Sequence, residues 1–408
     1  MTSTDVTIAD YFAPATRNNP YPVAKALRES APLHATPQGL QLVTRYGDCA
    51  LILRDPHFGH GYGEGLNPLR PTVEPDEVFG SFLRMDPPDH TRLRRLVVKA
   101  FNHKTVLALR PRMQALTDAF VGRLLADGGI DLVSELSFPL PLTIISEMLG
   151  VPAADHAQFL AWSAAIARGQ DPDELLTAQE IEARATALRE FTAYFRAYIA
   201  RRRAEPAGDL VSALAAVEEA GDALTERELV DICILLLAAG HETTANLLSN
   251  SVLNLLLHPE QAELLRARPE LLPDAIDELV RYDPPVQMSL RVALAEHEVA
   301  GHRFRRGEAA LILHASAHRD AAAYPDPDRL DVRRFAGQPA ATRHVAFGTG
   351  MHYCIGASLA RLEGEVVVGT LLRRVPSLRL AAQSRDQVKY HPHVALRGPR
   401  ELFVQAGS

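Results

Sequence analysis

Hydrophobic side chains recur with a helical period of about 3.6 residues along most of the chain, and this pattern predicts a mainly α-helical protein. The longest pattern runs from Glu226 to about Leu257. Thr225 and Glu228 form a capping box at its start, and His258-Pro259 marks its end. A helix of that length spans roughly 48 Å, which is enough to cross a whole domain. Further helical patterns run from about Arg92 to Asp127, from about Thr177 to Arg203 and from roughly Ala357 to Arg374.

Strand-like segments are short and lie between or outside the helical patterns. They cover Leu40 to Thr44, Ala309 to Leu313, and the tail around Leu402 to Val404. No internal repeat, low-complexity block or long Gly/Ser linker divides the chain. We therefore expect a single, mainly α domain over residues 1–408, with a long central helix and small peripheral β-sheets.

The composition is that of a soluble globular protein, with 47% hydrophobic and 23% charged residues. The formal net charge is −7 and no basic tract is present, so we expect no nucleic-acid partner. The N-terminus has neither a basic region nor an apolar core, so no signal peptide is expected. The most apolar stretch, Ile232 to Ala239, is too short to span a bilayer. A cytoplasmic protein without a membrane anchor is the expectation.

The three cysteines, Cys49, Cys233 and Cys354, show no CxxC spacing. An odd number without that spacing argues against a disulfide framework, a zinc knuckle and a c-type haem attachment. The context therefore looks reducing, as in the cytosol.

One cysteine ends a glycine-punctuated loop, and this is the most informative local feature. The loop reads Phe347-Gly348-Thr349-Gly350-Met351-His352-Tyr353-Cys354-Ile355-Gly356. Gly350 and Gly356 let the backbone fold tightly around the sulfur, so that N–H groups can point at it. The helix expected from Ala357 directs its positive end at the same atom, which favours a thiolate. A thiolate binds metals, and haem iron is one metal that takes a single Cys. A buried structural cysteine in a Gly-rich turn is the alternative.

This loop resembles the haem-binding signature of the cytochrome P-450 family. In that signature an aromatic residue, two glycines, a basic residue and the cysteine recur at the same spacing. The matching positions are Phe347, Gly350, His352, Cys354 and Gly356. The resemblance implies a P-450-type fold whose long central helix lies over haem b (iron protoporphyrin IX). The haem would be held non-covalently, with Cys354 as its iron ligand.

A glycine and several polar residues interrupt the apolar pattern in the middle of the longest helix. The segment reads Ala239-Gly240-His241-Glu242-Thr243-Thr244. Gly costs about 1 kcal/mol there relative to Ala, and Thr can bond back to the preceding turn. Room for a small ligand beside the helix is therefore expected, although a kink with a buried Thr and a surface Glu is the plainer alternative. The segment resembles the family's oxygen-activation motif, which implies Glu242 as a proton relay and Thr243 as its catalytic alcohol.

Glu278 and Arg281 stand three residues apart on one helix face. An arbitrary pair of this kind is usually a surface ion pair. Here its position resembles the family's buried Glu–Arg pair, which implies a structural brace. That brace would anchor the segment before the haem loop, in this chain Asp331 to Phe335.

Haem carries two propionate carboxylates, which need cationic partners when they are partly buried. Four residues match family positions for that role: His90, Arg94, Arg291 and His352. An exposed basic helix face is the alternative for His90 and Arg94, which lie at i and i+4. Ala239 is expected to lie against the cofactor.

By the same resemblance, substrate would be bound by residues from three parts of the chain, all but one of them apolar. These residues are Leu235, Ala238, Val286, Gln287, Met288 and Val394. Core packing is the alternative for each apolar residue singly. The glycine-rich segment from Gly59 to Phe82 is expected to be a mobile lid. The two alanines suggest a roomy pocket, and the apolar lining suggests a lipophilic substrate.

The resemblance implies a haem-dependent monooxygenase that uses dioxygen to hydroxylate or epoxidise a lipophilic molecule, such as a fatty acid, a terpenoid or steroid, or a macrolide. The chain shows neither a GxGxxG fingerprint nor a ferredoxin cysteine cluster. Electrons from NAD(P)H should therefore arrive through partners, namely ferredoxin and ferredoxin reductase, or flavodoxin. Two alternatives stay open: a peroxide-dependent peroxygenase, and a haem-thiolate sensor or electron carrier without a substrate. The intact Glu242-Thr243 pair disfavours the peroxygenase. Thr243, the expected lid and the apolar pocket disfavour the sensor or carrier.

Overall fold

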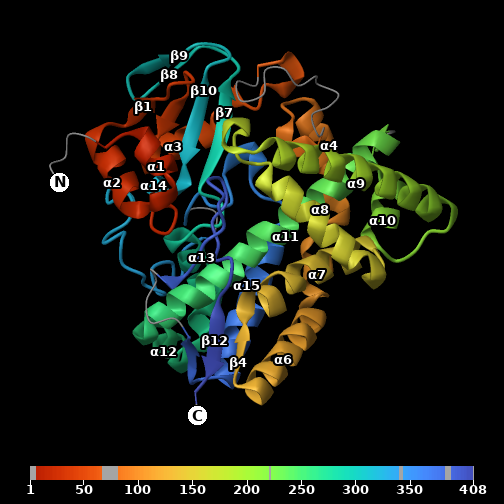
Figure 1. Cartoon of the computed structure of the whole chain (residues 1–408). Coiled ribbons are helices and arrows are strands. Elements are labelled where there is room, and N and C mark those ends of the chain that lie inside the picture. Colours follow the sequence, from red (N-terminus) through yellow and green to blue (C-terminus); the bar gives the residue numbers. More distant parts are fainter. Residues whose placement is uncertain (1–5, 67–80, 220–221, 340–342, 382–386, 408) are drawn as a thin grey trace. The chain divides into compact units, whose positions relative to one another are not determined.

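A computed structural model describes residues 6–66, 81–219, 222–339, 343–381 and 387–407. The chain forms two compact units. The first contains Met1–Gly59, Met113–Ser137 and Thr243–Ser408, and the second contains His60–Arg112 and Phe138–Glu242. Helices make up 58% of the chain, which confirms the mainly α prediction (Figure 1).

A five-stranded sheet organises one part of the first unit, with strand order β1-β2-β10-β7-β3 (Figure 1). All five residues of the central strand β10 are buried, which explains its run of apolar side chains. It pairs antiparallel with β7, from Ala309↔Val292 to Leu313↔Met288, and parallel with β2. The strands are β1 (Leu33–Ala35), β2 (Gln41–Val43), β3 (Phe58–Gly59), β7 (Met288–Ala293) and β10 (Ala309–Leu313).

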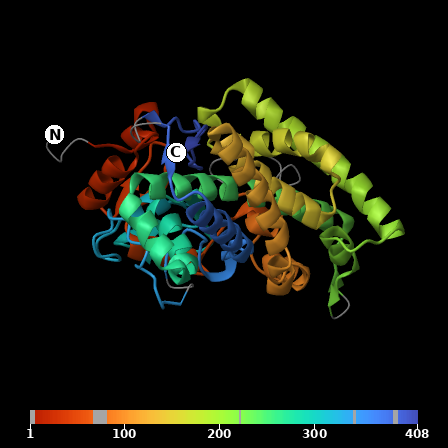
Figure 2. The same cartoon turned by 90° about the horizontal axis from the view of Figure 1, so that it is seen from below.

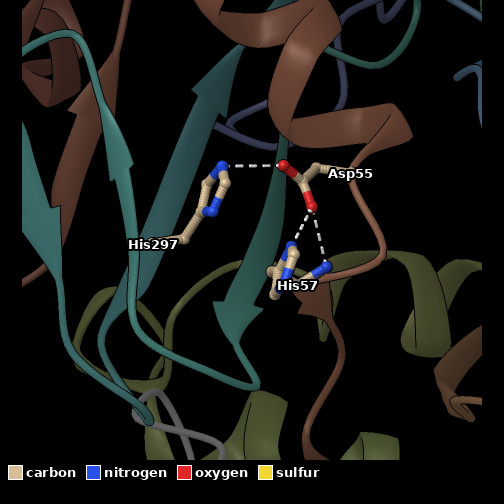
Figure 3. A group of neighbouring side chains, drawn as sticks. All are labelled: Asp55, His57 and His297. Carbon is tan, nitrogen blue, oxygen red and sulfur yellow. Dashed lines mark hydrogen bonds and ion pairs between the residues drawn. The ribbon is translucent and has the colours of Figure 1, made fainter.

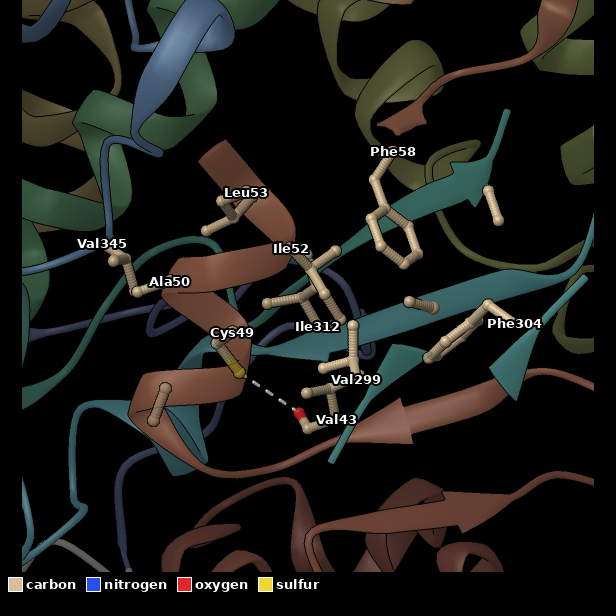
Figure 4. Close-up of a cluster of buried hydrophobic side chains, with 13 residues drawn as sticks. Val43, Cys49, Ala50, Ile52, Leu53, Phe58, Val299, Phe304, Ile312 and Val345 are labelled. Atoms are coloured by element: carbon tan, nitrogen blue, oxygen red, sulfur yellow. Dashed lines mark hydrogen bonds between the residues drawn. The ribbon is translucent and has the colours of Figure 1, made fainter. Parts of the chain in front are cut away.

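Short helices cover this sheet, and the hydrophobic core lies between them and the strands. Figure 4 shows Cys49 and Ile52 on α3 directed at the side chains of the strands, and Leu53 belongs to the same buried cluster with Val345. Ile312 and Phe304 complete the buried cluster from the opposite side. The helices here are α1 (Ile8–Phe12), α2 (Tyr21–Ser30), α3 (Tyr46–Arg54) and α14 (His314–Ala317), with the hairpin β8 (His297–Val299) and β9 (His302–Phe304) beside them.

The remaining helices of the first unit include the one that directly follows the Cys354 loop. Helix α15 (Ala357–Arg374) packs on α13 (Leu272–Tyr282), and Gly364 permits the close approach. A Cβ at that glycine would lie 3.1 Å from the Ile276 side chain. Also in this unit are α12 (Pro259–Ala267), most of α6 (Arg110–Asp127), the π-helix Val133–Ser137, and a sheet of order β11-β12-β4. Its strands are β11 (Leu378–Leu380), β12 (Phe403–Ala406) and β4 (Gly129–Asp131).

The second unit is built around two antiparallel helices, α8 (His156–Arg168) and α9 (Ala178–Ala204), which pack along each other (Figures 1 and 2). Phe159 and Trp162 of α8 interlock with Phe191 of α9 at ring-centroid distances of 4.6–5.3 Å. The other elements are α4 (Asp89–Ala100), α5 (His103–Leu107), α7 (Pro139–Leu149), α10 (Leu210–Ala216) and the ribbon β5 (Glu218–Glu219) and β6 (Asp222–Ala223).

Two helix predictions from the sequence agree with the structure at both ends. Helix α11 runs over Glu226–Leu257, and its start carries the expected box, because Thr225 N donates to the Glu228 carboxylate at 2.8 Å. Helix α15 begins at Ala357 and ends at Arg374. Among the described helices, only α11 is long and apolar enough to cross a membrane, and 78% of its most apolar window is buried. It is therefore the core helix that the pattern predicted.

The helical pattern predicted from about Arg92 to Asp127 is confirmed, and the structure divides it. That stretch contains three helices, α4, α5 and α6. Asn102 interrupts the pattern, because its side chain accepts a hydrogen bond from Thr105 N and caps α5. Of the expected lid, residues 67–80 lie outside the described part of the chain. Its ends contain short elements, β3 at Phe58–Gly59 and single 3₁₀ turns at Tyr62–Glu64 and Phe82–Arg84.

Candidate active site

The loop before Cys354 is closed by its own backbone and seated on α3. Cys354 N donates to Phe347 O at 2.8 Å. Gly350 has φ +70°, and a Cβ there would lie only 3.0 Å from Leu53 O and 3.1 Å from Arg54 Cα. Only glycine meets both the conformation and the close approach, so this position fixes how the loop sits on the end of α3.

The sulfur of Cys354 lies beside the N-terminus of α15. Gly356 is the cap residue of that helix, and a Cβ on it would be 3.8 Å from the sulfur. Cys354 is exposed, whereas Cys49 and Cys233 are fully buried and burial raises the pKa of both thiols. Cys354 is therefore the accessible thiol, and it stands where a helix end stabilises a negative charge.

A buried ionic network supports the loop from behind. The Arg361 guanidinium lies 4.5 Å from the centre of the Phe347 ring and donates to Asp277 at 2.7 Å. Burial alone would raise the pKa of Asp277, but hydrogen bonds and positive charge from His344 and Arg361 outweigh it and lower the pKa to about 2. Arg343 donates to the same carboxylate at 2.6 Å. Asp277 thus holds three basic side chains together as a permanent anion.

Glu278 and Arg281 form a bidentate ion pair on α13, and neither side chain is exposed. The two bonds measure 2.6 and 2.9 Å. Arg281 also donates to His318 O at 2.6 Å and to Pro327 O at 2.9 Å. Glu278 further accepts from Asp331 N at 3.0 Å and from Arg334 Nε at 3.1 Å. The pair therefore joins α13 to the segment that contains Asp331.

Glu242 is a buried carboxylic acid in the middle of α11. It is 3% exposed, and burial, together with the negative charge of Asp171, raises its pKa to about 8. The group is therefore largely protonated at neutral pH. Its predecessor His241 accepts from Ser163 Oγ at 2.9 Å through Nδ1 and bonds Phe138 O at 3.2 Å through Nε2. Because a carbonyl only accepts, Nε2 carries the proton, and burial keeps this ring neutral with a pKa of about 4.

Small residues open one side of this otherwise buried helix. Ala239 is exposed, and Ala238, Gly240 and Thr243 are partly exposed, while their neighbours on α11 are buried. Ala239 and Thr243 are four residues apart and so share a helix face. Helix α11 continues unbroken through this segment, so the expected opening comes from small side chains and not from a break in the helix.

The four cationic candidates fall on both units. In the first unit, Arg291 lies on β7 and His352 lies in the turn before Cys354, and both are buried. In the second unit, His90 is buried on α4, its ring 6.3 Å from that of Phe82, and Arg94 follows one turn later.

The predicted substrate residues are spread in the same way. Leu235 and Ala238 lie on α11. In the first unit, a β-bridge between Val286 and Leu396 brings the segment around Gln287 beside that around Val394. The side-chain amide of Gln287 donates a hydrogen bond to Pro284 O at 2.6 Å. Met288 and Val394 are buried in a core cluster with Tyr11 and Leu27.

The comparisons with known proteins agree on one family. Residues 75–404 match the profile of the Cytochrome P450 family. The chain is 40% identical to "Cytochrome P450 107B1" of Saccharopolyspora erythraea, over 96% of this chain and 95% of that protein. It is also 40% identical to "Mycinamicin IV hydroxylase/epoxidase" of Micromonospora griseorubida, covering 89% and 88% of the two chains. The chain belongs to the cytochrome P450 family.

A solved cytochrome P450 has the same fold. The structure of PksS, the cytochrome P450 of the Bacillus subtilis 168 bacillaene polyketide synthase, superposes with a TM-score of 0.86 at 33% identity and covers 98% of this chain and 99% of that one. The protein is thus a haem-thiolate monooxygenase, as the resemblance implied, and it depends on redox partners.

The residues around Cys354 fit a haem. The thiol is accessible, its loop is held in one conformation by Gly350, and two buried basic side chains, Arg291 and His352, lie in the same unit. A cavity of about 590 Å³ in this unit is lined by Tyr46, Tyr324 and Arg343 among others, and by none of the predicted site residues.

Sequence reasoning missed the network behind the loop. Asp277 directly precedes Glu278, and Arg361 follows Cys354 by seven residues. These positions beside recognised motifs were the only indication in the sequence that the two residues belong to the site. Nothing in the spacing shows that Arg361 would lie on Phe347. That contact depends on the packing of α15 against α13.

Proposed function

We propose that this cytochrome P450 hydroxylates or epoxidises a large lipophilic molecule of the macrocyclic polyketide class. The observation that carries the proposal is the exposed, small-residue face of α11, where Ala239 and Thr243 stand on one side of a buried helix. Small side chains there leave room for a bulky substrate. Supporting it, one relative is named for mycinamicin IV and one solved neighbour belongs to a polyketide synthase.

Cys354 is proposed as the haem ligand. When bound, the haem supplies the oxidising chemistry, in which one atom of dioxygen enters the substrate and the other is reduced to water. The chain holds the sulfur as an anion through the N-terminal end of α15 and fixes its position through the glycines of the loop. Arg291 and His352 are proposed partners of the propionates, with Phe347 and Ala239 as packing contacts of the macrocycle. The same role for His90 and Arg94 stays a prediction from the sequence.

Glu242 and Thr243 are proposed as the proton-delivery pair. With a pKa of about 8, the Glu242 carboxyl carries a proton at neutral pH and can release it, which a carboxyl with an ordinary pKa cannot do there. Thr243 follows directly and is partly exposed on the open face, so its hydroxyl can pass a proton toward that face. His241 stays neutral and anchors the helix beside them through Ser163.

Glu278 and Arg281 are proposed to act structurally, because both are fully buried and their bonds go to backbone and to Arg334. The proposed electron donors are ferredoxin with ferredoxin reductase, or flavodoxin, in the cytoplasm. Arg95, Lys99 and Lys104 are exposed basic residues of the second unit that could receive an acidic protein. Residues 1–408 are proposed to act as one catalytic domain.

The substrate proposal is tested by titrating the oxidised holoenzyme with a panel of macrolactones, steroids and fatty acids. Displacement of a water from the iron is read as a shift of the Soret band, and products are identified by mass spectrometry. The proposal predicts saturable shifts and oxygenated products with macrolactones. Saturable shifts with fatty acids alone would refute it.

The proton-delivery proposal is tested with Thr243→Ala. This variant should retain haem and bind substrate while NAD(P)H oxidation becomes uncoupled from product and releases peroxide. General acid catalysis contributes about 10²- to 10⁴-fold, so product formation should fall by at least about tenfold. Ser249→Ala removes a hydroxyl two turns along the same helix, where Ser249 bonds Ala245 O at 3.0 Å, and should stay coupled. Equal coupling in both variants would refute the role. A Thr243→Ala variant driven well by peroxide alone would favour the peroxygenase alternative.

A further inference from the structure

Three side chains of the first unit converge at the end of α3, and the activity described above uses none of them. They are Asp55, His57 and His297 (Figure 3). His57 Nδ1 lies 2.7 Å from one Asp55 oxygen, and His297 Nε2 lies 2.9 Å from the other. The donor atoms of all three residues lie within 4.8 Å of one another. Two imidazoles and a carboxylate thus share one small volume.

The two rings are arranged in parallel, as Figure 3 shows. Their centroids are 4.7 Å apart, with only 9° between the ring planes. Each ring directs one nitrogen at the same carboxylate from its own segment, His57 from the turn after α3 and His297 from β8.

Backbone bonds hold this arrangement. His57 N donates to Asp55 at 2.8 Å, and Leu294 N donates to His57 O at 2.7 Å. Phe58 then pairs with Ala293 as β3 joins the sheet. The residues that carry the side chains are therefore fixed by secondary structure on both sides, as a preformed binding site requires.

The carboxylate is an anion under ordinary conditions. Burial alone would raise the pKa of Asp55, but the backbone and side-chain hydrogen bonds from His57 outweigh it and lower the pKa. Asp55 is thus ready to act as a ligand, while His57 and His297 keep partial access to solvent, with 49% and 31% of their side chains exposed.

We propose that Asp55, His57 and His297 bind a divalent transition-metal ion of the zinc class. Two imidazole nitrogens and one carboxylate oxygen suit such ions, whereas Mg²⁺ and Ca²⁺ prefer all-oxygen sites. Zinc takes these donors at about 2.0–2.2 Å in a tetrahedron, and three protein ligands with one water is a common set.

Small side-chain movements suffice to make the site. Tetrahedral geometry at those bond lengths demands donor separations of roughly 3.3 Å. The donor atoms lie within 4.8 Å of one another, and the two His–Asp pairs at 2.7 and 2.9 Å must open slightly. His57 is half exposed and can turn to do so. On binding, the metal takes the place of the two hydrogen bonds to Asp55. Each neutral ring then carries its proton on its other nitrogen, so no redox step or further reactant is needed.

The metal would clamp the end of α3 to the β8–β9 hairpin. That end of α3 carries Leu53 and Arg54, the residues on which Gly350 of the Cys354 loop rests. Arg54 Nε also donates to Thr349 of the loop at 3.2 Å. The site is therefore next to the segment that supports the thiolate, without being part of it.

The test is calorimetric titration of the haem-loaded enzyme with ZnCl₂, with His297→Ala and His57→Gln as variants. The wild type should bind one Zn²⁺ at a saturable site. Each variant should weaken that binding by at least about 10- to 100-fold, since loss of a residue that merely supports a ligand already costs that much. His302→Ala is the matched control, because His302 lies in the same hairpin and pairs with Glu308 at 2.6 Å. It should bind Zn²⁺ like the wild type.

Haem content and the Soret spectrum verify the fold of each variant. Should His297→Ala fail to incorporate haem, the half-exposed His57→Gln decides the question. X-ray absorption at the zinc edge should show only N/O ligands at about 2.0–2.1 Å. Equal zinc affinity in wild type and both variants, a Zn–S distance near 2.3 Å, or no saturable binding would overturn the proposal.

Discussion

Replacing Glu278 by alanine should destabilise the protein severely and prevent stable haem incorporation. The side chain accepts four hydrogen bonds, two from Arg281 and one each from Asp331 N and Arg334 Nε. The variant leaves the fully buried Arg281 guanidinium without its counter-charge. Breaking a buried pair by removing one partner costs about 3–5 kcal/mol. Since a domain is stable by only about 5–15 kcal/mol, this is a fifth or more of a typical total.

The assay combines haem content of the purified protein with urea unfolding followed by circular dichroism. A matched control is Glu29→Ala, which removes the exposed partner of Lys25 at 3.9 Å on α2. Exposed pairs contribute about 0–1 kcal/mol, so that variant should keep its haem and nearly its full stability. If Glu278→Ala also kept wild-type haem content and stability within about 1 kcal/mol, the structural role of the pair would be refuted.

Two further substitutions probe the proton donor and the loop. The pKa of Glu242 is raised to about 8 in the folded protein, above its unfolded value of 4.5. Between pH 4.5 and about 8, the folded state therefore keeps a proton on this carboxyl that the unfolded state has lost. Stability should therefore fall as pH rises from about 4.5 to 8, and coupled turnover should fall as pH rises through 8. The Glu242→Gln variant should show a flatter dependence of stability on pH and a lower turnover at every pH. An unchanged dependence of stability on pH would contradict the assignment. Gly350→Ala places a Cβ 3.0 Å from Leu53 O at a φ of +70°, which should cost about 1–3 kcal/mol and lower haem retention, measured by haem transfer to apomyoglobin. Gly47→Ala, where a Cβ meets nothing within 4 Å, is its control.

Local signals predicted the elements that hold the chemistry. Helix α11 carries both its apolar period and its capping residues in consecutive sequence, so its bounds over Glu226–Leu257 followed directly. The same is true of α15, whose start is fixed by Gly356 and whose end precedes Pro376. The strand β10 was predictable because all its residues are apolar, and the structure shows that all of them are buried.

Features that depend on packing were not predictable in this way. The three-helix division of residues 92–127 rests on one side-chain cap at Asn102, a weak signal within a strong apolar period. The pKa of Glu242 follows from its burial beside Asp171, which is 71 residues away in sequence. The contact of Arg361 with Phe347 requires α15 to lie where it does. Met288 and Val394 were predicted to line a pocket, and in the structure both are buried together with Tyr11. Tyr11 belongs to an N-terminal segment that carries no recognisable motif, so this contact could not be predicted.

The most direct test of the account is the absorption spectrum of the reduced protein with carbon monoxide. Thiolate ligation by Cys354 predicts the red-shifted Soret band in the wild type and in Cys49→Ala and Cys233→Ala, whose thiols are fully buried. Cys354→Ala should lose the band. Its persistence in Cys354→Ala, or its absence from the wild type, would contradict the central claim that Cys354 is the ligand of an oxygen-activating haem.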